Sequence, residues 1–447
     1  MIPDSELAAD EGPNTEPRSR PRQVAVAGLL GTFIEFYDYT LYAFLVVYLA
    51  PHFFPSTDPA TGIVATLGVF GAGYVARPLG AIFFGMLGDR RGRRIALLWT
   101  ISGMGVATTL MGLLPTYEQI GVLAPILLVL TRVVQGFSAG GEIGGASTFV
   151  AETDGGSRRG WRQAFIPTGS AIGVAAAPAV VGLTAWLLGT QSMSAWGWRI
   201  PLLVSAVLAV LVLVYRSRIE DSAEFRSLAR TQRTRRSPLG AALKGHWRMI
   251  LVAASLNVSN TMILAVLVNY MNVYLLSTLK LPATLVYWLS AACLLAAAVG
   301  FLAGGAWVDR FGRLSTMVIG YGAAILLVFP LFQVMGELPG GGAGAVLWVG
   351  LVYTLALGFS YFAAPVLFVT MSQAFPTDVR YTSTALAYNI GAVVGGGTTP
   401  ALAAVLTASA GPLAARWLVV GACVLAIVVV FALTQRARNL EPAPSSP

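Results

Sequence analysis

The chain has 447 residues, of which 56% are hydrophobic and only 11% are charged. A soluble domain of this length needs a far more charged surface, so the composition excludes an ordinary soluble protein. The net charge of +9 would suit an anionic partner, but it is concentrated in short stretches between apolar segments.

Twelve apolar segments follow one another along the chain, each long enough to cross a hydrocarbon core of about 30 Å. We place them at roughly 24–50, 62–87, 95–114, 121–150, 163–188, 199–215, 249–277, 283–308, 315–335, 344–374, 383–408 and 412–434. The period-2 alternation of a membrane barrel is absent from these segments. The sequence therefore predicts an all-α membrane protein with twelve transmembrane helices.

Arginines mark alternate loops between these segments. The basic loops are 90–94, 158–162, 216–248, 310–313, 380 and 436–438. The other loops hold little beyond Arg199, Lys280 and Arg416. The positive-inside rule then predicts that both termini are cytoplasmic. Because this topology explains the net charge, no nucleic-acid partner is expected.

The chain also repeats itself. GMLGDRRGR (Gly85–Arg93) and GAWVDRFGR (Gly305–Arg313) both fit G-x-x-x-D-R-x-G-R and stand 220 residues apart. A weaker echo links SRRGW (157–161) to DVRYT (378–382). Two pseudo-symmetric six-helix bundles are predicted, and internal symmetry of this sort is typical of secondary transporters, whose site lies between the halves. The expected divisions are a tail 1–23, a bundle 24–215, a basic linker 216–248, a bundle 249–434 and a tail 435–447.

The paired loops, together with RVVQG (Arg132–Gly136), resemble the major facilitator superfamily. A narrower resemblance is to its metabolite:proton symporter family, whose members carry proline or betaine, shikimate, citrate and 2-oxoglutarate. The stretches that carry it are EFYDYTLYAF (Glu35–Phe44), ARPLGAIFFG (Ala76–Gly85), RVVQGFSAGGEIGG (Arg132–Gly145), GWRIP (Gly197–Pro201), FPTDVRYT (Phe375–Thr382) and LAYNIG (Leu386–Gly391). The resemblance implies a proton-coupled transporter of the cell membrane that works by alternating access, and not an enzyme.

Five ionisable residues fall well inside predicted spans: Glu35, Asp38, Arg77, Arg132 and Glu142. Each would cost roughly 2.5–3.5 kcal/mol unpaired at a helix centre, so they must face a cavity or one another. Depth pairs Asp38 with Arg132, while Arg77 could pair with Glu142 or with Glu35. We assign proton coupling to Asp38, Glu35, Arg132 and Glu142. The alternative is that these are inert ion pairs within the first bundle.

Matching the halves by the 220-residue offset leaves the second half without a deep ionisable residue. We therefore expect the first half to handle protons and solute charge, and the second to shape and hydrogen-bond the solute. The candidate substrate-binding residues are Arg77, Arg132, Gln135, Tyr42, Asn257, Asn260, Tyr361, Tyr388 and Asn389. Two buried arginines among three acids favour a monocarboxylate or a zwitterion over a tricarboxylate.

The repeated loops supply the candidate gate. Its residues are Asp89, Arg90, Arg93, Asp309, Arg310 and Arg313. A carboxylate at the end of one helix can cap the N-terminus of another and pair with a guanidinium. The family resemblance implies that the two aspartates latch the cytoplasmic gate in the outward-open state.

Alternatives to symport depend on the fifth span. It reads GSAIGVAAAP (Gly169–Pro178), whereas many drug:proton antiporters carry G-x-x-x-G-P-x-x-G-G there. The difference favours symport, with proton-coupled antiport as the alternative and a transporter-derived membrane sensor third. We expect no cofactor and no metal. The expected partners are a small organic solute, the proton and the lipid bilayer, and the chain is expected to act as a monomer.

Overall fold

The computed structural model describes residues 21–55, 59–153, 158–222, 225–227, 238–271, 274–275, 279–281, 283–335, 342–411 and 413–440. Most of both predicted tails, and positions 223–224 and 228–237 of the predicted linker, lie outside these described residues. Within the described ranges the regular elements are all helices.

The helices fall into two sets along the chain. The first set is α1 (Pro21–Phe53), α2 (Pro59–Arg91), α3 (Arg93–Leu113), α4 (Tyr117–Ile120), α5 (Leu123–Thr153), α6 (Arg159–Gln163), α7 (Phe165–Ser192), the π-helical η1 (Met193–Gly197) and α8 (Arg199–Ser217). The second set is α10 (Pro238–Leu264), η2 (Ala265–Tyr270), α12 (Ala283–Ala297), α13 (Val299–Met335), α14 (Gly342–Ala363), α15 (Pro365–Gln373), α16 (Arg380–Gly391), η5 (Ala392–Gly397), α17 (Thr398–Ala410) and α18 (Arg416–Leu440).

Ten helical runs among the described residues are long and apolar enough to cross a membrane. One of them, Trp288–Met335, is 48 residues long and holds two predicted spans. Gly312 divides it, because its φ of 83° is a left-handed conformation that glycine adopts without strain. The more polar run from α16 to α17 supplies one further crossing. The predicted all-α fold with twelve transmembrane helices is confirmed.

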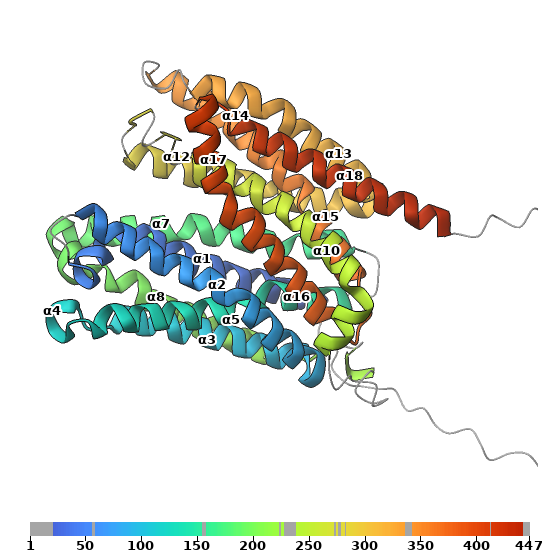
Figure 1. The fold of residues 1–447 in the computed structure, drawn as a ribbon, viewed down its shortest axis with the longest axis horizontal. Helices are drawn as coiled ribbons and strands as arrows, with labels where there is room; N and C mark the ends of the chain where they lie inside the picture. The colour runs from blue at the N-terminus through green and yellow to red at the C-terminus, as the bar shows by residue number, and fades with distance from the viewer. Residues whose placement is uncertain are drawn as a thin grey trace, which may run out of the picture.

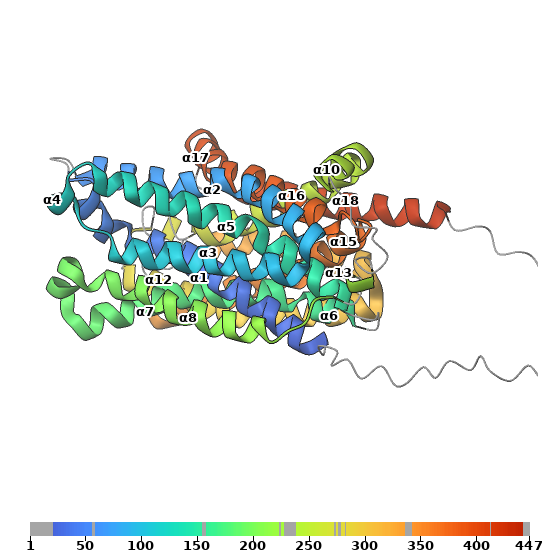
Figure 2. The ribbon, with the colours of Figure 1, turned by 90° about the horizontal axis from the view of Figure 1, so that it is seen from below.

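The two sets form two bundles lying side by side. Figure 1 shows the blue-to-green helices of the first half below most of the yellow-to-red helices of the second, with α16 reaching down beside α2. Across the boundary, α16 packs on α2 and α5, α12 packs on α7, and α13 packs on α6. The start of α1 and the end of α18 lie at the same end of the molecule, which we call the basal end (Figures 1 and 2).

Small residues bring α2 and α5 unusually close. A Cβ on Gly136 would collide with the backbone of Gly73, and one on Gly140 would lie 2.7 Å from the amide nitrogen of Ala81. Glycine is therefore required where the two backbones touch. This contact fixes the depth at which α2 presents Arg77 and α5 presents Arg132, both of which are buried.

Candidate functional site

Asp38 lies about halfway along α1 and is buried. Its carboxylate accepts hydrogen bonds from the Ser205 hydroxyl of α8 at 2.5 Å and from the Thr108 hydroxyl of α3 at 2.8 Å. Both donors are neutral, and no described guanidinium lies within ion-pair distance of this carboxylate. Sequence reasoning missed Thr108 and Ser205, because α3 and α8 each carry several hydroxyl side chains and the sequence does not show which of them faces a charge.

Arg132 reaches Asp38 only through neutral side chains. Its Nη1 donates to Gln135 Oε1, and Gln135 Nε2 donates to the Thr108 hydroxyl at 2.6 Å. The two charges are therefore connected through Gln135 and Thr108, and not by the direct ion pair that their depth predicts.

Aromatic rings surround the Arg132 guanidinium. Its central carbon lies 4.3 Å from the centre of the Tyr42 ring, 4.9 Å from that of Tyr39 and 5.0 Å from that of Phe70. Its Nε and Nη2 are buried without a hydrogen-bond partner among the described residues. Buried donors without acceptors are costly, and the rings offset only part of that cost. Arg132 thus has unused capacity for an acceptor.

The choice left open for Arg77 is settled in favour of Glu35. Arg77 Nη2 pairs with Glu35 Oε1, while Glu35 Oε2 is buried without a partner among the described residues. Arg77 Nε also donates to Asn389 Oδ1 at 3.4 Å, and Asn389 Nδ2 donates to the Gly140 carbonyl at 2.8 Å. This ion pair therefore lies where α16 of the second half meets the first half.

Glu142 belongs to a different ion pair. It accepts from Arg216 Nη2 at 2.5 Å and from the Thr100 hydroxyl at 2.6 Å. Arg216 falls in the range assigned to the linker, but α8 continues to Ser217 and buries it. Glu142 therefore pairs with Arg216 and Thr100 and not with Arg132, although the sequence assigns Glu142, Asp38 and Arg132 to one proton-coupling group. A basic residue within one turn of a predicted span end is the signal that could have identified Arg216.

The candidates of the second half are only partly brought together. Asn257 Nδ2 donates to the Tyr388 carbonyl at 2.5 Å, and Asn260 lies buried one turn further along α10. Tyr361 instead stacks on Phe301 of α13, with ring centres 4.1 Å apart. Among the described residues, the buried polar side chains of this half are neutral: Asn257, Ser259, Asn260, Ser290, Thr316, Ser360, Thr370, Ser372, Thr382, Ser383, Thr384, Asn389 and Thr399.

At the basal end, two aspartates cap helices of the opposite half. Asp89 accepts from the Thr382 amide at 2.9 Å and the Tyr381 amide at 3.2 Å, at the start of α16. Asp309 accepts from the Gly160 amide at 2.6 Å and the Trp161 amide at 2.9 Å, at the start of α6. The capped residues belong to the weaker of the two sequence repeats.

Arg93 is the centre of a buried ionic network beside Asp89. It donates to Asp89 at 2.8 Å, to Glu152 at 2.9 and 3.0 Å, and to the Thr377 carbonyl of the second half at 2.6 Å. Glu152 also pairs with Arg380 at 3.3 Å. Sequence reasoning missed Glu152, which lies just beyond the predicted fourth span. Its counterpart at the 221-residue offset of the weaker repeat is Gln373.

The remaining gate candidates contribute less to these contacts. Arg90 and Arg310 are exposed, and the Arg310 guanidinium lies 5.1 Å from the centre of the Phe311 ring. Arg313, the repeat counterpart of Arg93, donates to Gln373 Oε1. The structure therefore places Asp89, Arg93 and Asp309 between the halves, but not Arg310.

The chain is similar to known transporters over nearly its whole length. The family model of the Major Facilitator Superfamily matches residues 28–396. The inner membrane metabolite transport protein YhjE of Escherichia coli is 32% identical, with 95% of this chain and 96% of that protein covered. The glycine betaine/proline/ectoine/pipecolic acid transporter OusA of Dickeya dadantii is 34% identical (87% and 78% covered), and the shikimate transporter of Escherichia coli is 31% identical (95% and 95%).

Solved structures share the fold at low sequence identity. The proton:xylose symporter XylE bound to 6-bromo-6-deoxy-D-glucose has a TM-score of 0.73 at 17% identity, with 92% of this chain and 95% of that one covered. FucP in the outward conformation has a TM-score of 0.63 at 15% identity, with 92% and 99% covered.

Proposed function

The chain belongs to the Major Facilitator Superfamily, and from this we propose that it carries a small organic solute into the cell together with protons. A multi-pass membrane transporter is the class that the family establishes. The coupling ion, the solute and the orientation of the termini are what we propose, from the contacts of the buried charges.

The bonding of Asp38 is the observation that carries the proposal. Glu35 and Glu142 each face a guanidinium, whereas Asp38 is held only by the hydroxyls of Thr108 and Ser205. A buried carboxylate without a counter-ion keeps its charge at greater cost than one in an ion pair. Asp38 is therefore the acid best placed to take up and release a proton.

The unsatisfied atoms nearby suggest the charge of the solute. Arg132 offers two buried donors, and Glu35 offers one buried acceptor oxygen. Two acids and two arginines at this depth balance, so a solute with little net charge adds least electrostatic cost. Relatives are named for proline, betaine and shikimate, which fits a monocarboxylate or a zwitterion.

The chain of hydrogen bonds supplies a means of coupling. A solute carboxylate that accepts from Arg132 Nε and Nη2 would draw the guanidinium away from Gln135. Gln135 is the donor to Thr108, and Thr108 is a donor to Asp38. Solute binding would thereby change the hydrogen bonds that hold the Asp38 carboxylate, which links the solute to the proton.

Orientation follows from the basic loops. The arginine-rich loops at 90–94, 158–162 and 310–313 join helices at the end where Asp89 and Asp309 cap their partners. The positive-inside rule places this basal end, and with it both termini, in the cytoplasm. The latched basal end then corresponds to a closed cytoplasmic gate.

Uptake into proteoliposomes tests the proposal. Labelled proline, betaine and shikimate would be offered with the lumen alkaline, with the lumen acidic, and with either gradient collapsed by a protonophore. Symport predicts accumulation in the alkaline lumen alone, abolished by the protonophore. Accumulation in the acidic lumen would indicate antiport, and uptake indifferent to both gradients would refute proton coupling.

A further inference from the structure

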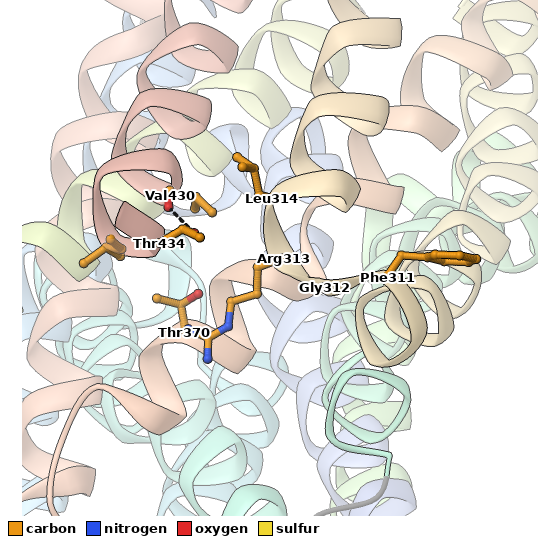
Figure 3. A pocket seen from close by; sticks show the side chains of 8 residues that line it. Phe311, Gly312, Arg313, Leu314, Thr370, Val430 and Thr434 are labelled. Atoms are coloured by element: carbon orange, nitrogen blue, oxygen red, sulfur yellow. Dashed lines mark hydrogen bonds between the residues drawn. The ribbon is translucent and has the colours of Figure 1, made fainter. Parts of the chain in front are cut away.

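A cavity of about 370 Å³ lies at the basal end of the second half, away from the cluster around Asp38 (Figure 3). It is bordered by the turn at Gly312 and by the helices α15 and α18. Its lining residues are Phe311, Gly312, Arg313, Leu314, Thr370, Val430, Leu433 and Thr434. Four of these side chains are apolar, and three are polar.

The Arg313 and Thr370 side chains line this cavity beside the start of a helical segment. Figure 3 shows the Arg313 side chain extending toward Thr370. The Thr370 hydroxyl has no partner among the described residues, although this residue is only 3% exposed. Gly312 interrupts α13, so a new helical segment begins at Arg313, and the first amides of a helix have no acceptor within it. Such an arrangement suits an anion.

Comparison with the other repeat shows that a negative charge is missing here. Arg93 pairs with both Asp89 and Glu152. Arg313 is the counterpart of Arg93, but where Glu152 would stand the chain has Gln373, a neutral acceptor. No carboxylate among the described residues lies within ion-pair distance of Arg313. One positive charge at this cavity therefore lacks a counter-ion.

We propose that the cavity binds the phosphodiester of an anionic phospholipid from the surrounding leaflet. A phosphodiester carries a negative charge that would serve as the counter-ion of Arg313, and its oxygens suit bidentate donation from arginine. Leu314, Val430 and Leu433 provide apolar surface for the glycerol and the start of the acyl chains.

The surroundings favour a lipid over a soluble phosphate. On the same helices, Val318 is 48% exposed and Phe431 is 49% exposed, so apolar surface that faces lipid continues from the cavity. Anionic lipids are concentrated in the cytoplasmic leaflet, where the basic loops are expected to lie. Inorganic phosphate would leave the apolar lining of the cavity unused.

The test is lipid binding by the purified, delipidated full-length protein, followed by native mass spectrometry. The protein is titrated separately with phosphatidylglycerol, phosphatidylcholine and inorganic phosphate. Phosphatidylglycerol should give a one-to-one complex at the lowest concentration. In Arg313→Gln, the concentration for half-occupancy should rise roughly tenfold, as expected for the loss of a charged hydrogen-bond donor.

Matched variants separate binding from folding. Arg310→Gln removes a neighbouring exposed charge outside the cavity lining and should leave the titration unchanged. Thr370→Val should weaken binding, and Thr370→Ser, which restores the hydroxyl, should recover it. If Arg313→Gln bound phosphatidylglycerol as wild type does, the site would be excluded. If inorganic phosphate bound as tightly as the lipid, the lipid would be excluded as the occupant.

Discussion

The Asp89 carboxylate accepts hydrogen bonds from both the amide and the hydroxyl of Thr382, at 2.9 and 2.7 Å, so a residue of α2 caps a helix of the opposite half. Asp309 caps α6 from the second half in the same way, through two backbone amides. Carboxylates at helix N-termini interact favourably with the helix dipole. The sequence repeat therefore corresponds to a pair of reciprocal caps across the boundary between the bundles.

Asp89→Asn and Asp309→Asn should shift the balance between the two access states while leaving solute recognition largely intact. Each change removes the charge and one acceptor oxygen from a cap. The ratio of closed to open basal ends should therefore fall roughly tenfold. Accessibility of a basal cysteine reports the shift, and solute binding in detergent reports recognition. Glu118→Gln, on an exposed helix at the opposite end, is the control. Loss of solute binding in a folded aspartate variant would contradict the latch role.

Gly85→Ala and Gly305→Ala should prevent the basal end from closing. A Cβ on Gly85 would lie 2.8 Å from Thr382 Cα, and one on Gly305 would lie 2.7 Å from Ala164 Cβ, so backbone would have to move in both places. Hydrogen exchange should accelerate at the first turns of α16 and α6. Gly322→Ala, where an added Cβ meets nothing within 4 Å, should leave these rates unchanged. Unaltered protection in the first two variants would show that this contact is dispensable.

The start of the linker should dock on the ionic network of Arg93 and Glu152 in a pH-dependent manner. Asp221 Oδ1 accepts from the Arg93 amide at 3.0 Å, the Ser222 hydroxyl donates to Glu152 at 2.6 Å, and the Phe225 ring centre lies 5.1 Å from the Arg93 guanidinium carbon. Burial raises the pKa of the Asp221 carboxyl above its ordinary value. The docked segment thus binds this proton more tightly than the undocked one, so docking is strongest at low pH and weakens as pH rises through the raised pKa.

Two variants at Asp221 separate charge from hydrogen bonding. Asp221→Asn keeps the Oδ1 acceptor but cannot ionise, so docking should persist and lose its pH dependence. Asp221→Ala removes the acceptor at the start of α3 and should release the segment at every pH. Hydrogen exchange of residues 218–222 across a pH series measures both effects. A pH dependence retained in Asp221→Asn would assign the titration to another group.

The sequence could predict the helices and the charges in them, but not how the charges pair. Apolar length and the repeated loops identified the spans, because each helix satisfies its own backbone in lipid. Depth along a helix did not distinguish the partner of Arg77. Its pairing with Glu35 depends on how α1 and α2 are rotated about their own axes, which depth does not give. Arg216 and Glu152 were missed because both lie within a turn of a predicted boundary, where hydropathy loses its signal.

Orientation can be tested with single cysteines. Cys293 and Cys423 are buried, so background labelling of the native thiols should be low. A cysteine at Glu118, at the end opposite the basal one, should react with an impermeant reagent in intact cells. A cysteine at Arg218, which is exposed at the basal end, should react only after permeabilisation. The reverse pattern would overturn the proposal that both termini are cytoplasmic.

Asp38→Asn should abolish uphill accumulation while preserving exchange of solute between the two sides. Asparagine keeps an acceptor oxygen for one of the two hydroxyls and can donate its amide to the oxygen of the other, but it cannot carry a proton, so the helices around it should stay in place. A proton crossing 100 mV supplies about 2.3 kcal/mol, and each pH unit adds about 1.4 kcal/mol. At one proton per solute, these two free energies together could concentrate a neutral solute roughly several-hundredfold.

Exchange needs no net release of the proton, and this is why the two activities should separate in Asp38→Asn. Proteoliposomes loaded with unlabelled solute measure exchange, and empty ones with an alkaline lumen measure accumulation. Gln135→Leu, which interrupts the connection from Arg132 to Thr108, should lower accumulation without abolishing it, because the Asp38 carboxyl remains. If Asp38→Asn accumulated solute at the wild-type rate, the proton would have to be carried elsewhere, and Glu35, with its unpartnered oxygen, would be the next residue to replace.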